Sequence, residues 1–257
     1  MTATIRRYFL PLRIAVVVVF FGVWQLLSIA GALNPIVVSR PSDIAAEIGL
    51  WFVDGSIWPT AGQTMLTFLE GYLAGVIVGV VIGVAMGASD SIRRYLDPFI
   101  LFFNAIPKLV LVPLLIAVYG FTNVPGVIIT FLVVVFLVAI TVEKGMEEIE
   151  GDFIANTRML GATNADIVRD VYLPAVGIWV ITSARLAIGL AFQSAVVAEF
   201  FGAGRGLGFL IVHGEQSFDV KEIWAGIVLT VVLALIIDGL LSLIDRRVSR
   251  WLPGQGV

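Results

Sequence analysis

Six stretches of this chain are long and apolar enough to be helices that cross a membrane. A helix needs about 20 mostly apolar residues to span the hydrocarbon of a bilayer. The stretches cover residues 14–33, 66–88, 99–118, 124–142, 175–198 and 223–244. Only 14% of the residues are charged and the mean hydropathy is +1.02, whereas about a quarter of a soluble domain is charged. The sequence therefore predicts an all-α membrane protein, with six transmembrane helices in a single domain over residues 1–257.

The distribution of basic residues predicts which side of the membrane each connection faces, because cytoplasmic connections carry the excess of Lys and Arg. With the N-terminus inside, only Arg40, Arg205 and Lys221 lie outside. The cytoplasmic set is Arg6, Arg7, Arg13, Arg93, Arg94, Lys144, Arg158, Arg169, Arg246, Arg247 and Arg250. We therefore expect a multi-pass protein with both termini in the cytoplasm.

The first stretch has a cleaved signal peptide as its alternative interpretation. Arg6, Arg7 and Arg13 precede it, and Ala30-Gly31-Ala32 looks like a cleavage site. Its apolar run exceeds the usual 7 to 15 residues of a signal peptide, so we expect a retained span. After it, Ser42 and Asp43 with Glu47 beyond them predict a short external amphipathic helix. Residues 89–98 are expected to form a short loop.

Five glycines at strict four-residue spacing mark the second span. They are Gly71, Gly75, Gly79, Gly83 and Gly87. Residues four apart share one face of a helix, so this face is a groove that another helix can approach to backbone contact. Packing within one subunit and a seam between two subunits are both compatible with it.

Several classes of site are not expected from the composition. The chain has no Cys, and its single His213, with Glu215 nearby, reads as an ordinary polar pair, so no metal site is predicted. A net charge of -3 without a basic cluster argues against nucleic-acid binding. A phosphate-binding loop needs Gly-Lys-Ser/Thr, yet no lysine here follows a glycine. We therefore expect neither ATP hydrolysis nor any other catalysis by this chain.

The cytoplasmic segment 143–174 is too long for a plain turn between two spans. Leu160, Ile167, Val168 and Val171 form one apolar stripe at helical spacing. Gly161 should bend or end a first short helix, and Pro174 suits the first turn of the next span. A short helix on the cytoplasmic face that docks on a partner is predicted, and a surface-lying connector without a partner is the alternative.

Several motifs, at matching spacing, resemble the nitrate, sulfonate and taurine branch of the ATP-binding-cassette (ABC) importer permeases. The family's cytoplasmic motif has Glu-Ala-Ala, three residues, Gly, nine residues and Ile-x-Leu-Pro. The matching segments here are Ala155-Asn156-Thr157-Arg158-Met159-Leu160-Gly161, Val171-Tyr172-Leu173-Pro174, Ile106-Pro107, Pro113-Leu114, Tyr119-Gly120-Phe121, Val197-Ala198-Glu199-Phe200-Phe201-Gly202 and Gly206-Leu207-Gly208-Phe209-Leu210-Ile211. The resemblance covers about residues 71–251. It departs from the motif where Ala155-Asn156-Thr157 replaces Glu-Ala-Ala and Val171 replaces Ile, so the motif's acidic residue is missing, or is supplied by Glu150 or Asp152.

The resemblance implies a type I ABC importer permease in a bacterial cytoplasmic (inner) membrane. It implies two ABC ATPase subunits that bind ATP and Mg, a second permease copy as homodimer partner, and an extracytoplasmic substrate-binding protein. It also implies that a coupling helix contacts the ATPase through Asp152, Ala155, Asn156, Thr157, Arg158, Gly161, Ala162, Val171, Leu173 and Pro174. A small, anionic, sulfonate-, nitrate- or taurine-like solute is the expected substrate class.

Polar residues within or beside the spans are candidates for the translocation path. They are Lys108, Arg185, Gln193, Ser194 and Glu199. A basic residue at the centre of a span costs about 2.5–3.5 kcal/mol, so Lys108 and Arg185 are expected to face a cavity, a partner or an interface. Pairing with a carboxylate and hydrogen bonds between helices are the alternatives. Gly202, Gly204, Gly206 and Gly208 predict a tight or re-entrant external turn that touches the substrate-delivering protein.

Two other classes of function remain as alternatives. An ion-gradient-driven secondary transporter would be expected to have paired carboxylates inside its spans, and only Asp238 lies well inside one. A membrane enzyme would need a converging catalytic set, which the spans lack.

Overall fold

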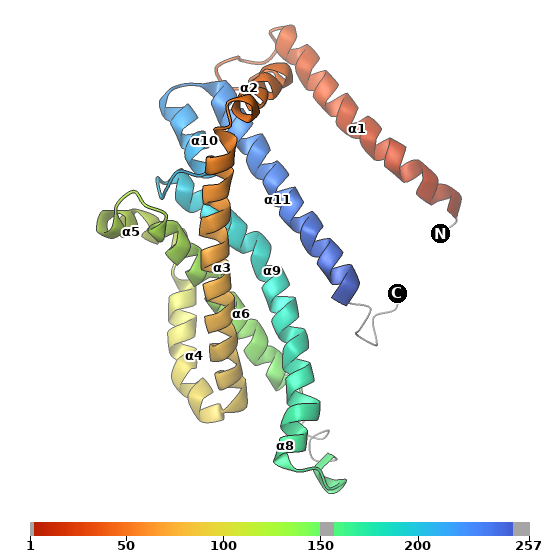
Figure 1. Ribbon diagram of the computed structural model, residues 1–257, viewed down its shortest axis with the longest axis vertical. Coiled ribbons are helices and arrows are strands. Elements are labelled where there is room, and N and C mark those ends of the chain that lie inside the picture. The colour runs from red at the N-terminus through yellow and green to blue at the C-terminus, as the bar shows by residue number, and fades with distance from the viewer. Residues whose placement is uncertain (1–2, 150–156, 249–257) are drawn as a thin grey trace.

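The computed structural model describes residues 3–149 and 157–248, and every regular element in these ranges is a helix (Figure 1). The elements are α1 (Ala3–Ile29), α2 (Pro41–Val53), α3 (Ile57–Ala88), α4 (Asp90–Ala105), the 3-10 turn η1 (Lys108–Leu111), α5 (Val112–Tyr119), α6 (Val124–Glu147), α8 (Asn164–Ile167), the π-helical turn η2 (Val168–Tyr172), α9 (Leu173–Phe200), α10 (Leu207–Gln216) and α11 (Val220–Val248). The all-α prediction is confirmed.

Four helical runs among the described residues are long and apolar enough to cross a bilayer. They are Ile57–Ala88, Val124–Glu147, Ala165–Phe200 and Val220–Leu240. A bent pair, Asp90–Ala105 with Lys108–Tyr119, makes a fifth if it is counted as one span. In α1 the apolar stretch Ala15–Ile29 is shorter, so the count of six spans stays a prediction.

The core of the bundle is the packing of α3, α6 and α9. Buried Phe68 of α3, Val134 and Val138 of α6, and Ala191 and Phe192 of α9 belong to one apolar cluster. Partly buried side chains of α11, such as Leu233, pack on the same cluster. This three-helix core fixes the positions of all the candidate site residues on α6 and α9.

The glycine face of α3 lies directly against α6. A methyl group on Gly75 would lie 2.6 Å from Cβ of Val134, and one on Gly79 would lie 2.8 Å from Cβ of Val138. The partners along α6 recur at the same spacing of four as the glycines, and they are Thr130, Val134, Val138, Val142 and Met146. Each side chain of α6 therefore occupies the space that a glycine leaves, which brings the two backbones into contact. This packing is within one subunit.

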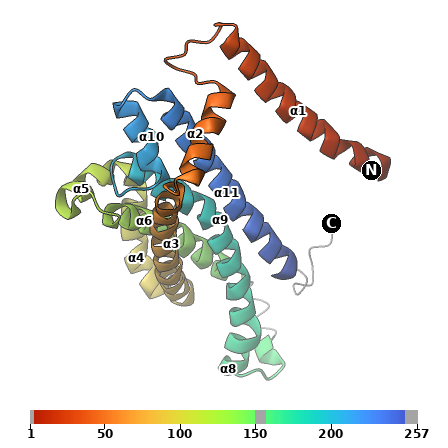
Figure 2. The ribbon, with the colours of Figure 1, turned by 45° about the horizontal axis from the view of Figure 1, so that its top comes forward.

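The bundle has two ends of different build. α2 and α10 lie at one end, here named the α10 end, and α8 lies beyond the opposite end of the core, here named the α8 end (Figure 1). α1 diverges from the other helices and meets them near the α10 end, as both views show (Figure 2). There Trp24 of α1 packs edge-on against Trp224 of α11, with ring centroids 5.2 Å apart.

The predicted third span is not one straight helix. Its two halves, α4 and α5 with η1, are bent by 75° at Ile106 and Pro107. Pro107 has no amide hydrogen for the helical ladder, and it forces the residue before it into extended geometry, with ψ of 126° at Ile106. The expected loop at 89–98 is also wrong, because α4 begins at Asp90 with Ser89 as its N-cap.

The expected separate cytoplasmic helix is instead the first part of a long helix. α8, η2 and α9 form one run over Ala165–Phe200. Pro174 removes a backbone donor inside this run. The turn just before it widens to π geometry, in which the Leu173 amide donates to the Val168 carbonyl five residues back. Pro174 therefore lies inside a continuous helix and does not begin a new one.

Two further expectations concern the ends of α2 and α9. A short helix is present where one was predicted, as α2, although Pro41 begins it and Ser42 does not cap it. Its place outside the membrane stays a prediction. The glycine-rich segment after α9 does contain a turn, with positive φ at Gly202 and Gly204. α10, which was not predicted, follows at once and places Gly206 and Gly208 in buried positions, away from an external contact surface.

Candidate functional site

The α8 end carries a helical tip built from two local capping motifs. Gly161 has φ of +92° and ends a helical turn over residues 157–159. The amide of Ala162 donates to the Thr157 carbonyl at 3.3 Å, and that of Gly161 donates to the Arg158 carbonyl at 3.0 Å. These two bonds are the Schellman arrangement, in which glycine takes the left-handed position without a steric penalty.

The next helix begins with a capping box. The hydroxyl of Thr163 accepts from the Asp166 amide at 3.3 Å, while Asp166 Oδ2 accepts from the Thr163 amide at 2.8 Å. This exchange satisfies donors that the first turn of α8 would otherwise leave free. Directly before Gly161, Met159 is 85% exposed and Leu160 is 89% exposed. The tip is therefore a locally rigid corner that presents apolar side chains to its surroundings.

The other predicted coupling residues lie on or near this corner. Thr157, Arg158 and Ala162 form the turn itself, and Val171 and Leu173 lie in or directly after η2. A cavity of about 410 Å³ separates η2 from the ends of α3 and α6, between Val84 and Met146 on one side and Tyr172 on the other. The predicted contacts Asp152, Ala155 and Asn156 lie outside the described residues.

An ion pair joins the beginning of α4 to the end of α6, near the cavity beside η2. Arg93 pairs with Glu147 of α6 and, at 3.0 Å, with Asp90 one turn before it. Because these side chains stay partly exposed, the pairs contribute little to stability, although they fix the α3–α4 corner relative to α6.

A second feature is the break between α4 and α5, where Lys108 lies. Its Nζ donates to the carbonyl of Asn104 at 2.7 Å and to the Asn104 side-chain oxygen at 2.8 Å. It also lies 5.4 Å from the ring centre of Phe136, which is at the middle of α6. Lys108 thus satisfies a carbonyl at the open end of α4 at mid-depth of the bundle.

Three of the five predicted path residues converge on one cavity at this break. The cavity measures about 310 Å³ and is lined by Lys108, Gln193 and Ser194, with Pro107, Leu109, Val133, Leu190 and Val197 as apolar walls. Asn104 and Phe136, which position the lysine, were missed from the sequence. The Asn-Ala-Ile-Pro-Lys order of residues 104–108 was the available signal for Asn104.

Arg185 and Glu199 do not join this cavity. Arg185 lines a separate space of about 300 Å³ between α9 and α11, where Asp238 also lies. Glu199 is fully buried in the last turn of α9. The five residues therefore occupy three different environments, which the sequence could not distinguish.

Glu199 is the centre of a buried polar cluster at the α10 end. Its Oε2 accepts from the Thr64 hydroxyl at 2.8 Å and from the Gly208 amide at 3.1 Å. The Thr64 hydroxyl in turn accepts from the Leu207 amide at 2.8 Å. A methyl group on Gly206 would overlap the Glu199 carboxylate, so the glycine lets α10 begin there. The cluster holds the N-terminus of α10 against α3 and α9.

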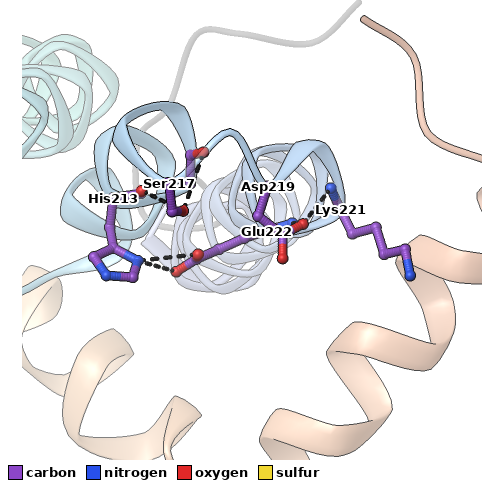
Figure 3. A network of polar contacts seen from close by, with 6 residues as sticks. His213, Ser217, Asp219, Lys221 and Glu222 are labelled. Carbon is purple, nitrogen blue, oxygen red and sulfur yellow. Dashed lines mark hydrogen bonds and ion pairs between the residues drawn. The ribbon is translucent and has the colours of Figure 1, made fainter. Parts of the chain in front are cut away.

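His213 of α10 pairs with Glu222 of α11, not with Glu215 (Figure 3). Its Nδ1 lies 2.8 Å and 3.0 Å from the two carboxylate oxygens. Asp219 caps α11 by accepting from the amides of Lys221 and Glu222. Within the part of the chain that the structure describes, no group of three His, Asp or Glu residues is placed to hold a metal.

A helical membrane bundle with polar groups at mid-depth and a projecting apolar corner defines a membrane transport protein. A family model described as "Binding-protein-dependent transport system inner membrane component" matches residues 71–250. The chain therefore belongs to this family, and it is an integral membrane component of a transport system.

Curated relatives and solved structures agree with this assignment. A probable ABC transporter permease protein of Brucella melitensis is 28% identical over 230 residues, covering 90% of this chain and 92% of the relative. The taurine transport system permease protein TauC of Escherichia coli is 24% identical, covering 93% and 89%. The nitrate import permease protein NrtB of Leptolyngbya laminosa is 28% identical, covering 95% and 89%.

The fold also matches a solved ABC importer. A chain of the MetNI methionine ABC transporter in an inward-facing conformation superposes with a TM-score of 0.61 at 22% identity. The match covers 72% of this chain and 93% of that one. The type I importer permease fold is thereby confirmed.

Proposed function

We propose that this chain is the permease of an ABC importer that moves a small oxyanion across the bacterial inner membrane, driven by separate ATPase subunits. The names of relatives that carry taurine, aliphatic sulfonates and nitrate support this substrate class. ATP and Mg would bind only to the ATPase subunits, because this chain has no Gly-Lys phosphate-binding loop.

The exposed corner at Met159 and Leu160 is the observation that carries the proposal. Large apolar side chains on a rigid projection mark a protein contact surface in a soluble compartment. The corner is joined to the core through one continuous helix over Ala165–Phe200, so a force on the corner moves α9 directly. We therefore assign the corner and η2 as the contact for the ATPase, with Leu173 and Pro174 connecting it to the membrane part.

The basic residues support an orientation with the α8 end in the cytoplasm. Arg93, Arg94, Lys144, Arg158 and Arg169 all lie at this end. Arg40, Arg205 and Lys221 lie at the other. Cytoplasmic connections carry the basic excess, so both termini would also be cytoplasmic, and the α10 end would meet the substrate-binding protein.

The polar groups at the α4–α5 break support a path between two copies of this chain. Lys108 and the exposed Gln193 lie at mid-depth, beside a helix break at Pro107. A broken backbone and a charge are tolerated there only where protein or a water-filled cavity, not lipid, covers them. A second copy that faces this surface would enclose the path. ATP-driven closure of the ATPases would then pivot α9 and switch access between the two sides.

Replacing Leu160 by Asp tests this function. The permease would be reconstituted in lipid vesicles with its ATPase and binding protein, and ATP hydrolysis stimulated by loaded binding protein would be measured. We expect L160D to lose that stimulation, because a buried charge replaces an apolar contact. L160M, which keeps the apolar volume, should retain it. Normal stimulation by an L160D permease that is monodisperse and correctly inserted would reject the proposal.

A further inference from the structure

We infer that the cavity at the α4–α5 break is an anion-binding subsite, in which the Lys108 ammonium and the Gln193 amide receive the oxygens of the transported solute. The inference rests on the proposed function and adds to it a location and the recognising groups. Membership of the family does not by itself say whether the membrane domain contacts the oxyanion, or through which residues.

The Lys108 ammonium is positioned by the protein and keeps a donor to offer. Two of its three N–H groups point to oxygens of Asn104, one on the backbone and one on the side chain. Among the described residues, no Asp or Glu lies within ion-pair distance of it. Its charge is therefore held in place by neutral oxygens, and the third N–H can meet an external acceptor.

The depth of Lys108 gives this charge a cost that a ligand would reduce. The ring centre of Phe136, at the middle of α6, lies 5.4 Å from the ammonium. A basic residue at this depth is unfavourable by about 2.5–3.5 kcal/mol. The ring of Phe136 attracts the ammonium only weakly. An anion would attract it more strongly, because a full negative charge acts in a medium of low dielectric. An anion in the cavity would be the counter-charge that the protein does not supply.

Gln193 and Ser194 supply the other polar side chains that line the cavity. The amide of Gln193 is exposed on α9 and has no hydrogen-bond partner among the described residues, so its NH₂ group can donate. The Ser194 hydroxyl donates to the Leu190 carbonyl at 2.6 Å, which leaves only its lone pairs for a ligand. Two donors, one of them charged, face the cavity, and this set suits an oxyanion.

The size and walls of the cavity limit what can bind. Its volume of about 310 Å³ is at the lower end of small-molecule pockets. Leu109, Val133, Leu190 and Val197 give it apolar walls, which can contact a short alkyl chain. The geometry therefore suits a small anion with or without a short apolar tail, such as an alkanesulfonate.

The test uses the purified permease–ATPase complex in lipid nanodiscs, without the binding protein, so that binding reports on the membrane domain alone. Radiolabelled ethanesulfonate is the probe, and its neutral isostere ethyl methyl sulfone is the competitor. We expect ethanesulfonate to bind and the sulfone not to displace it. Lys108→Met should weaken binding about tenfold or more, because a charge-assisted hydrogen bond is lost.

Three further variants separate recognition from folding. Lys108→Arg keeps the charge and should bind ethanesulfonate within about threefold of the parent, whereas Gln193→Leu should weaken binding about threefold to tenfold. Lys221→Met removes an exposed lysine outside the cavity, and it should bind as the parent does. Co-purification of the ATPase shows whether each variant is folded.

The inference is overturned if K108M or Q193L binds ethanesulfonate like the parent, if the sulfone competes equally, or if the parent does not bind the probe. Each of these results leaves the proposed importer intact as long as L160D still abolishes stimulated ATP hydrolysis. Loss of that L160D effect counts against the proposed function instead.

Discussion

The two ends of the bundle are held by different kinds of hydrogen bond. At the α10 end, Thr64 of α3 bonds to Glu199 and Leu207, which are 135 and 143 residues away in the sequence. At the α8 end, the two capping motifs that join described residues of the corner link residues no more than five apart, as in the pair Thr163 and Asp166. One end is thus buried and tied to the core by long-range bonds, while the other is shaped by local bonds and is joined to the core through the continuous helix Ala165–Phe200.

This difference indicates how the molecule can transmit a force. A corner that keeps its shape without the core can be gripped by a partner and moved as a unit. The cavity of about 410 Å³ between η2 and the ends of α3 and α6 leaves room for such movement. The α10 end, which is fixed by the buried carboxylate of Glu199, would be the fixed point against which α9 turns.

The largest effect is expected where the two ends are joined, at the α3–α6 seam. Gly75→Val would place its Cβ against Val134 and 3.1 Å from the Phe131 carbonyl, which cannot move away without displacing the backbone. We expect about 3 kcal/mol of destabilisation or failure to fold. Gly62→Ala, on the exposed face of the same helix with nothing within 4 Å, is the control and should be neutral or slightly stabilising. Thermal unfolding in detergent compares the two, and equal midpoints would contradict the seam.

A smaller effect is expected at the α10 end from Thr64→Val. The change removes the hydroxyl that donates to Glu199 and accepts from the Leu207 amide, so two buried polar groups lose a partner. We expect a loss of about 2 kcal/mol in the free energy of unfolding. Thr60→Val, one turn earlier, loses only a bond to its own helix at Ser56 and should change stability by about 0.5 kcal/mol or less. Equal losses in the two variants would show that the buried cluster does not fix this end.

The smallest effect on stability is expected at the α8 end from Gly161→Ala. Alanine at φ of +92° is strained by about 1 kcal/mol or more, but the strain falls on a corner that the core does not need. Thermal stability should therefore be nearly unchanged, while the affinity of the permease for the ATPase should fall. Gly177→Ala, within α9 and free of contacts, is the control for both measurements. A large loss of thermal stability in G161A would remove the distinction between the two ends.

The features that were predictable from the sequence are those governed by local rules. The spacing of Gly71 to Gly87 predicted a groove because helical periodicity fixes which residues share a face. Gly161 predicted the end of a short helix because few other residues take a left-handed conformation. Ser42 and Asp43, with Glu47 beyond them, predicted α2 in the same way.

Features that depend on distant pairings could not be predicted. Nothing around Thr64 indicates that it meets Glu199, since the two are brought together only when α3 packs on α9. α10 was hidden because Gly206 at its N-cap and Gly208 in its first turn are poor helix formers, and both are needed to fit against Glu199. The bend of 75° at Pro107 was missed because the third span was predicted from its apolar content, which does not show whether the helix axis changes direction.

The most direct test of the account is a cross-link between the corner and the ATPase. The chain contains no Cys, so Leu160→Cys gives a single reactive thiol at the α8 end. Ser217→Cys gives one at the exposed surface of the α10 end. In the assembled transporter, each thiol would be treated with a short thiol-to-amine cross-linker. The account predicts a product with the ATPase subunit from position 160 and none from position 217. Absence of an ATPase product at 160, or its presence at 217, would contradict it.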